Sequence, residues 1–187
     1  MCKYTEKQRR WNIYRDSILE DTLYKLDIQL DPEQDKILKN RENMITDDSD
    51  DDTFDVAIKC FQLISFGLLF NYPIHIKIIT PRHTDAKPIW NHLKHFIKLY
   101  PNDLEIQEDS YTRQSTLISK KSDIWIKTVT VFREENDDTN HEWLDLAVIY
   151  RCPFLDAALN TAVMTLSNQG VCEVYFCKNS SKIILNN

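Results

Sequence analysis

Five stretches of the chain place apolar residues at helical spacing. In residues 4–30 the apolar positions form one stripe and the opposite positions are charged. Residues 53–71 are apolar around most of the helix, which is typical of a helix at the centre of a domain. The other three helices are predicted over 32–44, 84–100 and 153–170, where Asp31 and two prolines supply start signals and Gly170 a stop signal.

The segments between these helices are short and rich in β-branched and aromatic residues. They predict strands over residues 74–80, 104–107, 112–118, 124–132, 144–149, 171–177 and 182–185. Residues 144–149 are apolar on both faces except for Asp145, which suits the middle of a parallel sheet. The alternation of helices and strands predicts an α/β fold, a three-layer sandwich with a largely parallel central sheet and right-handed crossovers.

A run of acidic residues separates an N-terminal helical segment from the rest. Residues 46–52, TDDSDDD, are too charged to pack. We therefore expect a helical arm over 1–46, an acidic linker over 47–52 and an α/β domain over 53–187. The stripe that includes Trp11, Tyr14 and Ile18 has two interpretations. We favour packing of the arm on the main domain, because such a stripe usually belongs to a core; the alternative is that these residues bind a partner.

Composition narrows the class of protein. The chain has 187 residues and a net charge of −6, so it has no overall basic footprint for nucleic acid, although the acidic run holds much of that charge. Five cysteines at spacings that match no zinc pattern predict buried free thiols in a reducing compartment. The N-terminus has no apolar signal core, and the run 61–70 is too short to span a bilayer. We expect an intracellular protein, cytoplasmic or nuclear, without a membrane partner.

The two glycines exclude the common nucleotide-binding motifs. Gly67 and Gly170 lie far apart, and they are the only glycines in the sequence. A phosphate-binding loop of the GxxxxGK[ST] type needs two glycines five positions apart, and a dinucleotide fingerprint needs three close together. Neither motif can be written with these two residues.

The segments VAIKCFQLISF, ITPRHTDAKPIWNHLKHF and AVIYRCPFLD lie between about Thr46 and Ser181, and together they resemble the ATPase core of the large terminase subunit. That motor packages DNA in tailed phages and herpesviruses and belongs to the RecA-like P-loop class. The segment VAIKCFQLISF after Thr53 is similar to the buried helix that a Gly-Lys-Thr phosphate loop opens in the family. ITPRHTDAKPIWNHLKHF resembles the next strand and helix, and AVIYRCPFLD resembles the flanks of the strand that ends in Asp-Glu-Ala.

The departures from the family fall on its catalytic positions. Asp51 and Asp52 stand at the phosphate loop, where they would repel phosphates. Tyr150 and Arg151 stand where the Asp-Glu pair would hold Mg²⁺ and position water. No catalytic residue of the family carries over. The resemblance therefore implies a relative that keeps the scaffold without hydrolysing ATP, with no cofactor and no metal.

Other groups of residues have both a functional and a plain interpretation. Histidines 83, 92 and 95 could bind a metal, but solvated histidines fit better, since no third ligand has an obvious claim. Cys152 follows a strand, but its neighbours are too large for a nucleophile elbow. Lys127 and the carboxylates of Asp123 and of residues 134–137 have no convincing nuclease spacing. A basic face beside Trp90 could bind single-stranded nucleic acid, or it is a solvated helix face; its residues are Arg82, Lys87, Lys94 and Lys98.

Two functions from different classes follow. The first is a non-enzymatic protein-binding or assembly protein on an inactive P-loop-type domain, which would hold a protein partner or oligomerise through its arm. A viral source would suit such a relative of a packaging motor. The alternative is a nucleic-acid-binding protein or unconventional nuclease that uses the Arg82–Lys98 face.

Overall fold

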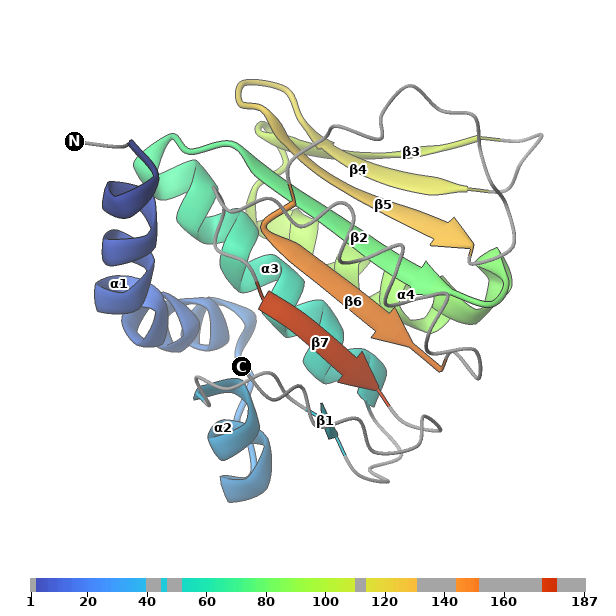
Figure 1. Ribbon diagram of the computed structural model, residues 1–187, viewed down its shortest axis with the longest axis horizontal. Helices are drawn as coiled ribbons and strands as arrows, with labels where there is room; N and C mark the ends of the chain where they lie inside the picture. The colour runs from blue at the N-terminus through green and yellow to red at the C-terminus, as the bar shows by residue number, and fades with distance from the viewer. Residues whose placement is uncertain are drawn as a thin grey trace.

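The computed structural model describes residues 3–39, 45–46, 52–109, 114–130, 144–151 and 173–177. Four α-helices, seven strands and two short 3₁₀ helices lie in this part of the chain (Figure 1). The helices are α1 Lys3–Leu26, α2 Pro32–Lys39, α3 Asp52–Phe70, η1 His83–Ala86, α4 Lys87–Phe96 and η2 Ile97–Leu99. The strands are β1 Ile45–Thr46, β2 Ile74–Thr80, β3 Leu104–Glu108, β4 Ser115–Ser119, β5 Ile124–Thr130, β6 Leu146–Tyr150 and β7 Glu173–Cys177.

The seven strands form one sheet in the order β1-β7-β6-β2-β5-β4-β3. The strands from β1 to β5 in this order are parallel to their neighbours, while β4 and β3 are antiparallel. The sheet is therefore mixed and parallel in its middle, which confirms the predicted α/β class. Residues 74–80 form β2 with the predicted bounds. The sequence did not predict β1, and the predicted helix at 153–170 and strand at 182–185 lie outside the described residues.

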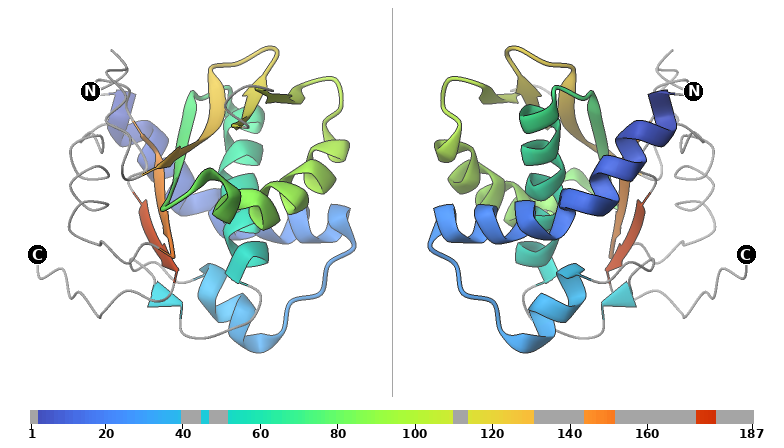
Figure 2. Two further views of the ribbon diagram at one scale, coloured as in Figure 1. Left: turned by 90° about the vertical axis from the view of Figure 1, so that its right-hand side faces the viewer. Right: turned by 90° about the vertical axis from the view of Figure 1, so that its left-hand side faces the viewer.

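Helix α3 is the centre of the layer that covers one face of the sheet. It packs on β2 and β5, and α4, α1 and α2 pack around it (Figure 2). By length and composition Thr53–Phe70 could cross a membrane, but most of this helix is buried inside the fold, which accounts for its apolar composition. Gly67 lets α3 approach the sheet closely, because a Cβ atom there would lie 2.4 Å from Cγ1 of Ile74. Asn71 ends the helix in the left-handed region, with φ 56°.

The first two helices share the core of the sheet domain. Trp11 and Leu19 of α1 and Leu38 of α2 belong to the same cluster of buried residues as Phe61 of α3 and Ile76 of β2. The favoured interpretation, that these helices pack on the main domain, is confirmed. Residues 47–51 lie outside the described residues, so the predicted boundary at 47–52 stays a prediction.

Candidate functional site

The parallel strands end at one edge of the sheet, which we call the carboxyl edge. Tyr150 of β6 pairs in register with Cys177 of β7, and Thr46 of β1 pairs with the same Cys177. Strand β1 is followed in the chain by α3, and a phosphate-binding unit likewise has a strand followed by a helix. In open α/β sheets, ligands bind in the crevice outside this edge. The fold therefore places the beginning of α3 and the tip of β6 where a nucleotide would have to bind.

The tip of β6 is closed by an aromatic ring and a cation. The Tyr150 side chain is buried in the core on the α3 side, at 1% exposure. Arg151 is exposed, and its guanidinium carbon lies 5.1 Å from the centre of the Tyr150 ring. Its backbone is left-handed, with φ 51°, a conformation that costs a non-glycine residue about 1–2 kcal/mol. A Mg²⁺ site needs oxygen ligands at this tip, and neither side chain fits that need.

The beginning of α3 already carries its own negative charge. The Asp55 carboxylate in the first turn is 1% exposed, and Gln34 Nε2 of α2 donates to it over 3.4 Å. Carboxylates at this end stabilise a helix because they complement its dipole. The same position attracts phosphate in proteins that bind it there, so Asp55 opposes an incoming phosphate. The described residues at this end of α3 and at the tip of β6 thus present a buried carboxylate, an aromatic ring and a cation.

The four residues of the predicted basic face are exposed, but two of them pair with acids. Arg82 bonds Asp85 over 3.2 Å, and Lys94 pairs with Glu108. Trp90, which the nucleic-acid interpretation placed beside this face, is 4% exposed, and its Nε1–H donates to Thr128 Oγ1 over 2.8 Å. A buried ring offers no surface on which a base could stack. The assignment of Arg82, Lys87, Lys94 and Lys98 to nucleic acid stays a prediction.

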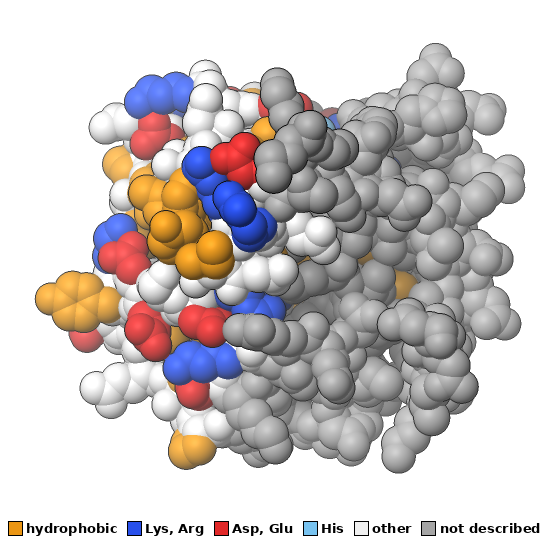
Figure 3. Space-filling view, turned by 60° about the vertical axis from the view of Figure 1, so that its left-hand side comes forward, with side chains coloured by type: hydrophobic (Ala, Val, Ile, Leu, Met, Phe, Trp, Pro, Cys, Tyr) orange, Lys and Arg blue, Asp and Glu red, His pale blue; other side chains and the backbone are white. Residues whose placement is uncertain are grey.

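The three residues predicted to bind a partner have different surroundings. Trp11 and Ile18 are 1% and 6% exposed, and Trp11 packs edge-on against Phe66 of α3 at 5.3 Å. Neither offers surface to a partner in this conformation. Tyr14 is 43% exposed and its ring lies 5.1 Å from that of Phe70. Hydrophobic side chains gather in one patch on this side of the molecule (Figure 3). We define the α1–α3 patch by the rings of Tyr14, Phe70 and Tyr72, which contact one another at 5.1 and 6.5 Å.

The remaining candidates do not assemble into a site. Among the described residues, no three of His, Cys, Asp or Glu lie close enough to hold a metal. His83 Nε2 lies 3.0 Å from Gln114 Nε2, and His92 packs edge-on against Phe54. Asp123 pairs with His75 Nε2 at 3.0 Å, and the Lys127 ammonium lies 4.5 Å from the centre of the Trp125 ring. Cys152 and residues 134–137 lie outside the described residues.

A buried ion pair at the opposite edge of the sheet was not predicted. Lys7 Nζ of α1 lies 2.5 Å from Oδ1 of Asp145, just before β6, and it also donates to Pro73 O over 2.6 Å. The two side chains are 10% and 4% exposed. The backbone N–H of His75 donates to the other oxygen of Asp145 over 3.0 Å. The polar Asp145 within an apolar strand was a visible signal, but nothing in the sequence pointed to Lys7 as its partner.

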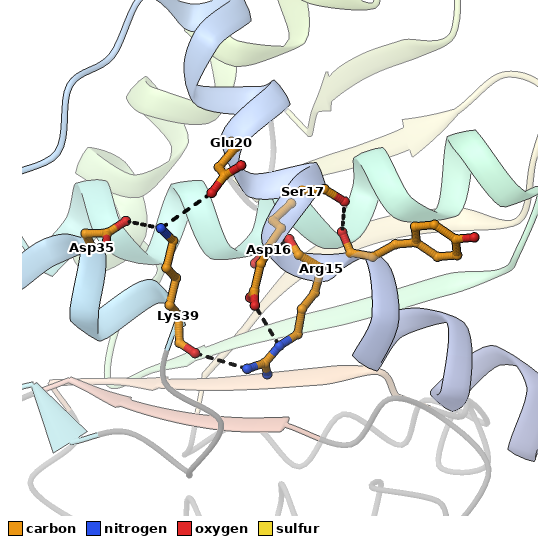
Figure 4. A network of polar contacts seen from close by, with 8 residues as sticks. Arg15, Asp16, Ser17, Glu20, Asp35 and Lys39 are labelled. Atoms are coloured by element: carbon orange, nitrogen blue, oxygen red, sulfur yellow. Dashed lines mark hydrogen bonds and ion pairs between the residues drawn. The ribbon is translucent and has the colours of Figure 1, made fainter.

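A second polar network fastens α2 to α1. Nη2 of Arg15, a residue that is 3% exposed, donates to Lys39 O over 3.0 Å (Figure 4). Lys39 Nζ in turn bonds Asp35 at 2.9 Å and lies 3.6 Å from Glu20. Below this network, Gln62 of α3 donates to Arg15 O over 2.6 Å. The helices before the acidic run are therefore held by specific polar contacts as well as by apolar packing.

The chain matches no established family of protein sequences and no curated protein. Among solved structures, the large terminase of the thermophilic bacteriophage D6E superposes with a TM-score of 0.59 at 13% identity. That match covers 81% of this chain and 39% of the D6E chain. The fold is that of a large terminase ATPase domain. At this low identity the likeness is one of fold alone, and it confirms the expected scaffold.

Two further structures support the same fold. The large terminase ATPase domain of Thermus phage P74-26 has a TM-score of 0.57 and 10% identity, covering 87% of this chain and 69% of that one. The D6E large terminase in complex with ADP has a TM-score of 0.54 and 11% identity, with coverages of 79% and 38%. The chain therefore spans well under half of the D6E terminase and about two thirds of the isolated ATPase domain.

Proposed function

We propose that this chain is a non-hydrolysing assembly protein, built on a terminase-type ATPase fold and acting through its surface. The observation that carries the proposal is the tip of β6, which ends in Tyr150 and Arg151 and offers no carboxylate. Hydrolysis requires a carboxylate for Mg²⁺ and a residue that positions the attacking water. A guanidinium stacked on a buried ring can do neither.

The beginning of α3 supports the same conclusion independently. A phosphate cradle requires consecutive backbone N–H groups in a glycine-rich loop and a lysine near the β- and γ-phosphates. The segment 47–51 contains no glycine and no lysine, and four of its five residues are aspartates. With Asp55 buried in the next turn, the local charge opposes a triphosphate.

The likeness to terminases supports a viral setting, in which a small protein with this fold could join a larger assembly. The α1–α3 patch supports a role in binding protein, because Tyr14 is 43% exposed; Leu69 of α3 and Ile13 of α1 are also exposed, at 67% and 62%. Large apolar side chains gathered on a surface with charged neighbours mark interaction sites. The scaffold then supplies stability, and the contacts are made outside the carboxyl edge.

Isothermal titration of the full chain with ATP and Mg²⁺ tests the absence of nucleotide binding. The P74-26 ATPase domain serves as the comparison protein under the same conditions. We expect no saturable heat with the full chain, and we expect the same result for ADP and GTP. Micromolar binding, or phosphate release above that of the buffer, would contradict the proposal.

The nucleic-acid alternative has less support. Two of its four basic residues pair with acids, and Trp90 is buried. A filter-binding titration with single-stranded DNA at low and high salt separates the two functions. If this face binds nucleic acid, charge reversal at Lys94 and Lys98 weakens binding more than reversal at Lys25, which lies on α1.

A further inference from the structure

The outer face of α1 has a charge pattern that is complementary to itself. Its basic residues Arg9 and Arg10 precede the exposed Ile13, and its acidic residues Glu20 and Asp21 follow it. Arg9 is exposed, as is Ile13 at 62%. The side chains of Arg10, Glu20 and Asp21 are 40%, 67% and 56% exposed. The charges therefore remain accessible on the face of α1 that is turned away from the buried Trp11 and Leu19.

The spacing of these charges matches two antiparallel copies of the helix. Arg9 and Glu20 are eleven residues apart, as are Arg10 and Asp21. Eleven residues make slightly more than three turns of 3.6 residues, so the members of each pair lie on the same flank of the outer face. Ile13 and Ser17 lie between the two flanks, and the small Ser17 allows close approach. A two-fold axis level with position 15 then brings Arg9 to within one residue of the level of Glu20 of a second copy on one flank, and Arg10 to within one residue of Asp21 on the other.

We propose that two copies of this chain pair antiparallel through the outer face of α1. The proposal rests on the assembly role proposed above and names the partner as a second copy. A two-fold interface must be complementary to itself, and the order basic, apolar, acidic along one helix meets that condition. A different partner would need acidic residues opposite Arg9 and Arg10 and basic residues opposite Glu20 and Asp21. An antiparallel second copy of α1 already has this order.

The existing contacts of these charges allow such pairing. Arg10 bonds Glu6 over 2.6 Å, Asp21 bonds Lys25 over 2.6 Å, and Glu20 lies 3.6 Å from Lys39. Exposed pairs of this kind contribute little to stability, so the same charges can also face a second copy. The buried face of α1 keeps its contacts, because Trp11 and Leu19 point into the core. One helix face per copy is a small interface, so we expect a dimer that dissociates on dilution.

Charge-swap complementation with the full chain tests this pairing. One variant carries Arg9→Glu and Arg10→Glu, and the other carries Glu20→Lys and Asp21→Lys. Each variant alone places like charges opposite each other, so we expect its dimer dissociation constant to rise at least about tenfold in sedimentation equilibrium. In an equimolar mixture the two variants face each other with opposite charges, and we expect a heterodimer at wild-type affinity.

Controls make each outcome informative. Gln8→Glu changes the charge on another side of α1 and should leave the dissociation constant unchanged, while Ile13→Asp should raise it. Circular dichroism melting verifies that all variants are folded. A wild-type chain that is monomeric up to millimolar concentration overturns the proposal, and so does a dimer that the charge variants leave intact or whose mixture is not restored. Nucleotide titration is independent of these results, so the two proposals can fail separately.

Discussion

Breaking the ion pair between Lys7 and Asp145 should cost far more stability than any exposed pair in the protein. We expect Asp145→Leu to lower the free energy of unfolding by about 3–5 kcal/mol, because it leaves the Lys7 ammonium in a buried site without its carboxylate. The pair counts as a buried ion pair, because its atoms lie 2.5 Å apart and its two side chains are only 10% and 4% exposed. The variant also removes the acceptor of the His75 N–H.

The two partners can be separated in a double-mutant cycle. Lys7→Met should cost about 3 kcal/mol, because the Asp145 carboxylate then stays buried without its counter-ion. The combined variant buries no unpaired charge, so it should be more stable than the sum of the two single changes predicts by about 2–3 kcal/mol. The control is Lys121→Met, which breaks an exposed pair with Asp103 and should cost less than about 1 kcal/mol.

Urea unfolding followed by far-UV circular dichroism measures these differences. With a slope of about 2 kcal/mol/M, a loss of 3 kcal/mol moves the midpoint down by about 1.5 M. If the single variants lose no more than the Lys121 control, or if their effects simply add, α1 is not fastened to the sheet through this pair and the reasoning is refuted.

Three further predictions concern single positions in the described part of the chain. Gly67→Ala should lower the free energy of unfolding by about 1–3 kcal/mol in urea, because its Cβ would lie 2.4 Å from Ile74 Cγ1. The control is Ser65→Ala on the same helix. It should leave the free energy of unfolding unchanged, because the buried Ser65 hydroxyl finds no hydrogen-bond partner among the described residues. Burial raises the pKa of the Cys60 thiol to about 12 from an ordinary value of 9.0, so peptide mapping should find Cys60 unlabelled by maleimide until the protein unfolds. Because the folded protein holds this thiol protonated, stability should fall as pH rises above 9.0 toward 12, and Cys60→Ala should lose that part of the dependence. Arg151→Gly should be about 1 kcal/mol more stable than Arg151→Ala in thermal melting, because glycine adopts the left-handed φ of 51° without strain; equal stability would contradict the strain at the strand tip.

The core elements could be predicted because their patterns are strong. β2 has the predicted bounds, since four isoleucines and a threonine stand within the seven residues between Pro73 and Pro81. Helix α3 begins one residue before the predicted start and ends one residue before the predicted end, because its apolar girth and its acidic first turn are both visible in sequence. β1 was missed because two residues carry no periodicity, and only pairing with β7 makes Ile45 and Thr46 a strand.

The site was harder to predict, because burial of particular side chains depends on tertiary contacts. Trp11 and Ile18 share a stripe with Tyr14, yet only Tyr14 is exposed, since α3 covers one side of α1 and leaves the other open. Lys7 looks like a solvated residue in sequence, but the fold places it against Asp145, far along the chain. The absence of a glycine-rich loop before α3 and of a carboxylate at Tyr150 could be read from the sequence, because both depend only on which residues are present.

Titration of the full chain with Mg²⁺–ATP is the most direct test of the proposal that this chain does not bind nucleotide. Isothermal titration, with the P74-26 ATPase domain as comparison, measures this binding without any assumption about partners. We expect no saturable binding at the carboxyl edge, since Tyr150 and Arg151 offer no carboxylate to a metal and the buried Asp55 opposes a triphosphate. Micromolar affinity that is lost on Arg151→Glu would place a nucleotide at this edge and contradict the proposed function.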